Sequence, residues 1–522
     1  MYLFGENEEL VLPDNDTNLT SLTINNMGLE DISFLEEYKI SDRKYIRLDL
    51  SNNNINFSNE KDKTILRKIL SEMEHGFTLK LSNNGISDIS FLEGLEDDVI
   101  SLDLTFNNID FENENNQKII KEIVSNMYNY YGNAKSIQIG GQGLDLNVEY
   151  VDIPDESLKR CLINEYDLNK DGEMQVEEMK KVERIGNILG SGYVENFICP
   201  STLKGLEYAV YADTLSILYN ENLPAQDFKY VYFIKTLEIV NGNSNEELGY
   251  IGVETGEVKI NGIENLFILN SLGVYNGCEN ANFIVDESLV SNTLNDLELV
   301  NTSIEYEKGL ENLQKFAFEG NGKDATPYID FASLCKKIWN LQIGVGSFEN
   351  YEGLEKLSNV THLITGTGLV GNMYRYSAGN RNTSETNLLE NLVKMQGLEN
   401  LSFGGFYKID GTKLKDGFEN LKSLKITGNV NYLSFLKNCP KLKDVEYRYG
   451  CACKEDSMDI EEFVEVQKYL YNNNINFSYS SSENGKPNCI YVDLGTIPSN
   501  RTKTIDLFSK FEWLEKLYRK LI

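Results

Sequence analysis

One stretch of the sequence carries oxygen-bearing side chains at a spacing that suits a hard cation. These residues are Asp167, Asn169, Asp171, Glu173, Gln175 and Glu178. Carboxylate, amide and backbone carbonyl oxygens are the ligands that Ca²⁺ prefers in proteins, with the carbonyl supplied at the seventh position of the loop and a bidentate carboxylate at the twelfth. Gly172 permits the sharp turn that such a loop makes at its sixth position. The pattern predicts a structural calcium site formed by Asp167, Asn169, Asp171, Glu173 and Glu178.

The elements that must position this loop are two helices. Leu158 and Leu162 precede the loop at helical spacing, and Met179 and Val182 follow it. Residues 147–190 therefore resemble an EF-hand module, and specifically the EF-hand-like module that precedes repeat arrays in Gram-positive surface proteins. That resemblance implies a cap at the start of a second array. The alternative is an acidic turn between two helices that binds no metal.

The module lies between two arrays of repeats. In the first, the segment Leu48-x-Leu50-x-x-Asn53-x-Ile55 recurs at Leu102, and each copy is followed by apolar residues at helical spacing, in 63–73 and 117–127. Alternating apolar residues direct one face of a short strand inward, the Asn turns the chain, and a helix returns behind the strand. The strands of this array are expected to centre on Thr23, Asp49, Lys80, Asp103 and Gln138.

These residues follow the leucine-rich-repeat consensus, L-x-x-L-x-L-x-x-N-x-L. The connections in 27–35 and 85–92, each reading Ile/Leu-x-Asp-Ile-Ser-Phe-Leu, are similar to those of bacterial internalin-like proteins. The resemblance implies an α/β fold, a leucine-rich-repeat solenoid shaped as a curved horseshoe. Parallel strands would line its concave face, and helices and irregular coils its convex face.

A second array is expected from about residue 191 to 450. Ten positions there each begin a two-residue alternation: Leu215, Leu237, Leu272, Leu297, Phe316, Leu341, Leu363, Leu401, Leu424 and Val445. The insert at 250–260 alternates about a turn and predicts a hairpin. The domain prediction is therefore a first array at 1–146, the EF-hand-like module at 147–190, a second array at 191–450 and a C-terminal cap at 451–522, with helices in 460–471 and 508–521.

The composition restricts the class of partner. A net charge of −32 disfavours nucleic acid, because phosphates need cations from the protein. No apolar run approaches the length that spans a bilayer, so no membrane insertion is expected. The eight cysteines form no Cys-x-x-Cys pair. His75 and His362 lie at or beside strand positions, and the motifs of hydrolases, phosphate-binding loops and metalloproteases are absent, so we expect a protein that is not an enzyme.

The leading functional hypothesis is a monomeric protein-binding scaffold that holds a protein ligand on its concave face, as in a surface or secreted adhesion protein. Two alternatives remain, a cytosolic acidic inhibitor or immunity protein for a basic toxin or nuclease and a carbohydrate-binding surface protein. The resemblance implies an extracellular location, and the lack of a signal peptide in this chain implies a cytoplasmic one. Aromatic and Arg side chains on the 371–381 insert suit an interface. The predicted partner-binding residues are Tyr374, Arg375, Tyr376, Arg381, Glu238 and Glu298.

Overall fold

The computed structural model of the chain describes residues 21–37, 45–125, 135–186, 198–242, 252–266, 268–278, 280–286, 293–320, 324–344, 348–366, 386–404, 408–450 and 460–482. These residues divide into two compact units. The first contains the described residues as far as 320 together with Phe331–Ile338, and the second contains the others from 324 onward.

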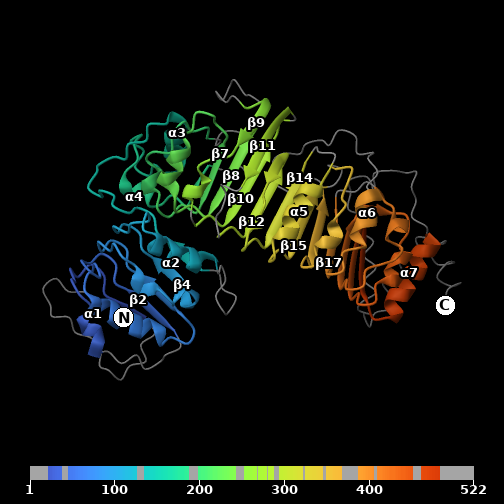
Figure 1. The fold of residues 1–522 in the computed structure, drawn as a ribbon, viewed down its shortest axis with the longest axis horizontal. Coiled ribbons are helices and arrows are strands. Elements are labelled where there is room, and N and C mark those ends of the chain that lie inside the picture. Colours follow the sequence, from blue (N-terminus) through green and yellow to red (C-terminus); the bar gives the residue numbers. More distant parts are fainter. Residues whose placement is uncertain are drawn as a thin grey trace. The chain divides into compact units, whose positions relative to one another are not determined.

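The first unit begins with a five-stranded sheet in which each strand pairs in parallel with the next along the chain. Its strands are β1 (Ser21–Thr23), β2 (Ile46–Asp49), β3 (Phe77–Lys80), β4 (Val99–Asp103) and β5 (Ser136–Gln138). Helices α1 (Glu60–Ser71) and α2 (Glu114–Ser125) lie in the return segments (Figure 1). All five strands predicted from the leucine pattern are confirmed.

A buried amide closes the turn after most of these strands. Asn53 accepts hydrogen bonds from the backbone N–H groups of Met27 and Leu29 at 3.0 and 3.1 Å and donates to the carbonyls of Ile24 and Leu50 at 2.9 Å. Equivalent amides follow in the later coils, at Asn84, Asn107 and Gln142. Buried backbone groups must be paired, so each amide satisfies the turn of its own coil and of the coil before it.

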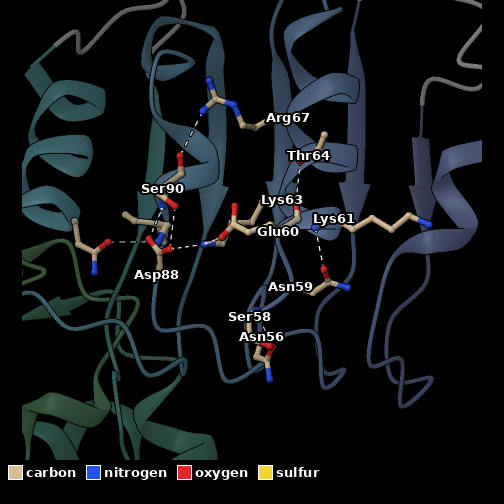
Figure 2. A network of polar contacts seen from close by, with 12 residues as sticks. Asn56, Ser58, Asn59, Glu60, Lys61, Lys63, Thr64, Arg67, Asp88 and Ser90 are labelled. Carbon is tan, nitrogen blue, oxygen red and sulfur yellow. Dashed lines mark hydrogen bonds and ion pairs between the residues drawn. The ribbon is translucent and has the colours of Figure 1, made fainter.

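The return segments are also tied to their neighbours. Asp62 of α1 accepts from the backbone N–H of Ile32 at 3.2 Å, and Asn116 of α2 accepts from that of Ile89 at 3.3 Å. The next residue of α1 is Lys63, whose ammonium lies 2.6 Å from Asp88 of the following coil (Figure 2). This ion pair holds the pKa of Lys63 above its ordinary value. Neighbouring coils are thus bonded on both sides of the helix.

The helix–loop–helix segment comes next. Helix α3 (Glu156–Tyr166) begins at Asp155, whose carboxylate caps it by accepting from the N–H of Leu158 at 2.9 Å. Helix α4 (Val176–Met179) is a single turn, followed by the short strand β6 (Arg184–Ile185). The second oxygen of Asp155 accepts from the N–H of Ser201 at 2.7 Å, which attaches the start of α3 to the chain beyond β6.

A second parallel sheet in the first unit runs in the order β6, β7, β8, β10, β12, β14. Its further strands are β7 (Thr214–Leu218), β8 (Thr236–Asn241), β10 (Ser271–Asn276), β12 (Asp296–Val300) and β14 (Lys315–Glu319). Short 3₁₀ helices lie in the return segments, at Leu206–Tyr208, Ala225–Val231 and Ile263–Asn265.

The predicted hairpin in 250–260 is wrong for the residues that the structure describes there. Strand β9 (Thr255–Lys259) pairs in parallel with β11 (Asn280–Asp286), which in turn pairs with β13 (Thr302–Glu305). Successive coils thus add a second small sheet beside the main one. A strand in such a coil finds its partner in the next coil, and local alternation alone cannot distinguish this pairing from a hairpin.

The second unit continues the pattern of parallel strands and return segments. Helix α5 (Thr326–Leu334) belongs to this unit as far as Asp330 and to the first unit from Phe331. The later elements are β15 (Asn340–Gly344), β16 (His362–Gly366), α6 (Thr386–Leu392), β17 (Asn400–Phe403), β18 (Lys408–Ile409), β19 (Ser423–Thr427), β20 (Asn429–Val430), β21 (Asp444–Gly450), α7 (Ile460–Asn472) and β22 (Asn476–Ser482). Three further 3₁₀ helices are Leu354–Lys356, Gly411–Leu414 and Ser434–Asn438.

All ten strands expected in the second array are present, and α7 confirms the helix predicted at 460–471. The chain is an α/β leucine-rich-repeat solenoid. The helix predicted at 508–521 lies outside the described residues, and the proposed boundaries of the arrays and caps stay predictions. Within the described ranges, no helix has the length and apolar character needed to cross a bilayer.

Candidate functional site

The open face of the sheets carries the candidate binding residues. In most strands of the main sheets, the residue between two inward-facing apolar residues lies on the opposite face of the sheet, as Asp49 does between Leu48 and Leu50. We call the row of these outward positions the strand face. In the first sheet its members are half-buried or exposed: Thr23, Asp49, Lys80, Asp103 and Gln138. Parallel register places them side by side at about 4.8 Å intervals.

The strand face of the second sheet differs because much of it is buried. The register aligns Ser216, Glu238, Gly273, Glu298 and Ala317. Glu238 is only 8% exposed, and its carboxylate accepts a hydrogen bond from the Ser216 hydroxyl. A partner therefore reaches Glu298, which is half-buried, more easily than Glu238.

Tyr275 explains part of this burial. A side chain at Gly273 would meet the Tyr275 hydroxyl at 2.4 Å, so the absence of a side chain there lets the tyrosine ring lie across the strand. The hydroxyl donates to the Glu298 carboxylate at 2.8 Å. Glu238 and Glu298 thus flank a tyrosine that comes from the strand between them.

Burial of the Glu298 and Asp296 carboxyl groups disfavours their charged forms. It raises the pKa of Glu298 and of Asp296 above their ordinary values, and the negative charges of Asp296 and Glu238 add to the effect on Glu298. Lys315 lies 3.9 Å from Asp296 and is half-exposed, so it offsets the charge weakly. This part of the strand face is therefore acidic and well suited to a cationic group.

In the second unit the strand face is more open, and it includes the apolar Ile364 between Gln342 and Ser402. Gln342, Ser402, Lys425 and Glu446 are all half-buried, and Lys425 lies 3.5 Å from Glu446 on the neighbouring strand. These are amide, hydroxyl and charged groups that form hydrogen bonds in several directions.

His362 and Trp339 lie at one edge of this face. Their rings meet edge to face with centroids 4.9 Å apart, and Trp339 is 37% exposed. The His362 ring nitrogens lie 2.9 Å from the Thr361 hydroxyl and 3.0 Å from the Asn400 amide. The imidazole is thus held by Thr361 of its own coil and by Asn400 of the next.

The acidic loop is closed by hydrogen bonds to its own backbone. Asp167 accepts from the N–H groups of Lys170 at 2.6 Å and Gly172 at 2.9 Å, and Asp171 accepts from that of Glu173 at 2.9 Å. Lys170 and Gly172 have positive φ angles of 62° and 84°. Gly172 therefore makes the sharp turn for which the sequence pattern requires glycine.

Glu178, the predicted bidentate ligand, is 5% exposed and bonds to both ends of the loop. One oxygen accepts from the N–H groups of Leu168 and Asn169 at 2.8 and 3.3 Å, and the other accepts from that of Gln175 at 3.1 Å. Glu173 pairs with Lys159 at 2.7 Å through its side chain, which leaves its backbone carbonyl for a ligand role. The donor types therefore suit Ca²⁺.

The spatial arrangement fits less well. Across the described ranges, no three His, Cys, Asp or Glu side chains are grouped so as to share a metal ion. In this conformation the loop carboxylates bond to backbone amides instead. The remaining predicted site residues, Tyr374, Arg375, Tyr376 and Arg381, lie outside the described residues.

Comparisons with known proteins give the following. No protein-family profile matches the sequence, and no curated protein matches it. Among solved structures, the chain is similar to the internalin inlF of Listeria monocytogenes, at 15% identity and a TM-score of 0.31, over 65% of this chain and 92% of that one. It is similar to internalin C2 of the same species, at 15% identity and a TM-score of 0.25, over 65% and 96%. It is also similar to a leucine-rich-repeat protein of Leptospira interrogans, at 12% identity and a TM-score of 0.29, over 88% and 95%.

Proposed function

We propose that this chain is a protein-binding scaffold that holds its partner against the strand face. The observation that carries the proposal is the register of that face. Parallel pairing aligns the residues between the inward-facing apolar ones of neighbouring strands in rows fixed by backbone hydrogen bonds, and most of these residues in the first sheet and in the second unit are at least half-buried polar side chains. A rigid array of polar groups loses little conformational entropy when it binds, which favours recognition of another folded surface or an extended segment.

The charges favour a basic partner. Glu238, Asp296 and Glu298 lie together on the second sheet, and the pKa of Glu298 is raised by burial and by the negative charges of its neighbours. A cationic side chain placed over them would relieve that repulsion, and the net charge of −32 would speed its approach.

Affinity capture tests the proposal. The full chain, immobilised, is expected to retain a basic protein from extracts of its source, with a retention that falls as salt is raised. A matched double variant, Glu238→Gln with Glu298→Gln, keeps the shape of the face and removes two charges, so it should retain less at low salt. Equal capture by both chains at every salt concentration would contradict the charge argument.

The identity of the recovered partner distinguishes the possible settings. We propose a surface or secreted interaction protein, because that is what the resemblance in the repeat connections implies. A toxin or nuclease in the captured fraction would instead indicate an inhibitor, and a glycan without protein would indicate a carbohydrate-binding protein.

We also propose that the loop at Asp167, Asn169, Asp171, Glu173 and Glu178 takes up calcium. Its support is the oxygen donor set and the positive φ of Gly172. Binding to the folded state alone raises its stability, so millimolar Ca²⁺ should raise the melting temperature of the parent chain and leave Glu178→Gln unchanged. An unchanged midpoint in the parent, with chelator and with calcium, would refute this proposal without affecting the proposal for the strand face.

A further inference from the structure

One residue breaks a rule that the first array otherwise follows. Each strand of the first array is followed by a residue with a positive φ angle, in the left-handed region. This residue lies two positions after the last inward-facing apolar residue of the strand, as Asn52 does after Leu50. The five residues are Asn26, Asn52, Asn83, Phe106 and Gly141. Asparagine and glycine adopt this conformation at little cost, whereas a bulky residue is strained in it. Phe106, at φ 56°, is the exception. Strain of this kind persists where surrounding contacts hold it, so those contacts indicate what Phe106 does.

The ring of Phe106 contacts two other segments. The Lys180 ammonium, at the end of α4, lies over it at 5.0 Å from the centroid. A side chain on Gly141 would lie 2.7 Å from the ring, so glycine at this position of the next coil makes room for the phenylalanine. Phe106 therefore joins the last two coils of the first array to the helix–loop–helix segment through a cation–π contact and close packing.

The last coil of the first array is completed by residues of the second. The Tyr232 hydroxyl donates to the carbonyl of Ile139 at 3.1 Å and accepts from the N–H of Gln142 at 3.3 Å. A side chain on Gly140 would lie 2.8 Å from the Cβ of Val210, which shows how closely the two segments approach. These backbone groups follow β5, beyond which the described residues add no further strand to this sheet.

The end coil of a solenoid needs a cap, because its core and its backbone groups are otherwise exposed. Here Tyr232 and Val210 cover that end, and Thr105 adds a contact to the Tyr211 hydroxyl at 3.4 Å. We propose that Phe106 and Tyr232 form a latch that makes the coils of β4–β5 and those of β7–β8 one cooperative folding unit. The first array has no free C-terminal end, and its opening requires release of the second. This inference is independent of the proposed partner and of calcium.

Hydrogen exchange of the full chain tests the latch. In the parent, amides of β4 and β5 and amides of β7 and β8 should share one opening event, with the same dependence on denaturant. Phe106→Asn introduces the residue found at the matching position of three other coils and relieves the backbone strain. If only this strain mattered, the variant would be more stable and the amides of 136–142 would exchange more slowly. The latch instead predicts that exchange in 136–142 becomes at least about tenfold faster and separates from that of β7 and β8.

Two further variants make the result decisive. Tyr232→Phe removes only the hydroxyl, from the second array, and should produce the same separation. Asn83→Gly occupies the equivalent position one coil earlier, keeps the left-handed conformation, and should leave the coupling intact. Unchanged or slower exchange of 136–142 in both Phe106→Asn and Tyr232→Phe, or independent opening of the two regions in the parent, would overturn the proposal.

Discussion

Replacement of Asn53 by alanine tests how the repeat turns are held together. Asn53 is 6% exposed, and its side chain bonds to the N–H groups of Met27 and Leu29 and to the carbonyls of Ile24 and Leu50. Alanine leaves two backbone donors without partners. At about 1.5 kcal/mol for each unsatisfied donor, the loss of stability is about 3 kcal/mol.

The neighbouring Asn54 is the matched control. It is exposed, and Asn54→Ala should change the stability by less than about 0.5 kcal/mol. Because a chain of this length need not unfold in one step, the assay is urea dependence of hydrogen exchange at β1 and β2, where local opening energies are measured directly. Equal opening energies in Asn53→Ala and Asn54→Ala would refute the argument that buried amides hold the turns.

Two other predictions concern the second sheet. Burial raises the pKa of Glu298 above that of an unfolded glutamate, so protonation favours the folded state. The coils of β10 and β12 should therefore gain stability as the pH falls from 7 toward about 4.3. Glu298→Gln should reduce that gain and leave the part that comes from Asp296, as measured by hydrogen exchange at both pH values. Gly262 has a φ angle of 88°, and a Cβ there would lie 2.3 Å from the Ala225 carbonyl oxygen, so Gly262→Ala should lower the free energy of urea unfolding by about 2 kcal/mol. Gly256 has a φ angle of 98° and open space around it, so Gly256→Ala should lower it by about half as much. Equal losses in the two variants would contradict the steric argument.

The main strands were predictable from sequence because their signal is local. A buried pair such as Leu48 and Leu50, followed by Asn53, fixes strand, face and turn within six residues. The same alternation identified the outward positions that make up the strand face. The helices behind the first sheet were predictable for the same reason, since their apolar residues recur at helical spacing.

The features that could not be predicted from the sequence depend on contacts between different coils. Strand β9 looks like half of a hairpin until β11 is placed beside it, one coil later. Glu238 accepts a hydrogen bond from Ser216 of the strand before it, and Tyr275 of the strand after it lies over Gly273, the position paired with Glu238. The hydrogen bond from Tyr232 to Ile139 joins residues far apart in the chain, so no local sequence pattern predicts it.

The site residues show the same division. The acidic loop could be recognised because its donors are consecutive, and its turn at Gly172 follows from the sequence. The bonding of Glu178 to Leu168 and Gln175 could not be foreseen, because a carboxylate serves equally as a cation ligand or as an acceptor for backbone amides.

Binding of a protein partner to the strand face can be tested by titrating the recovered partner against two variants. Gln342→Arg with Ser402→Arg places bulk and charge on that face, whereas Glu355→Arg places the same group on an exposed position of the return segment at Leu354–Lys356. Both chains should melt at the parent temperature. We expect at least about tenfold weaker binding for the strand-face variant, about 1.4 kcal/mol, and parent affinity for Glu355→Arg. Parent affinity in the strand-face variant together with a loss in Glu355→Arg would contradict this expectation and place the partner on the return segments.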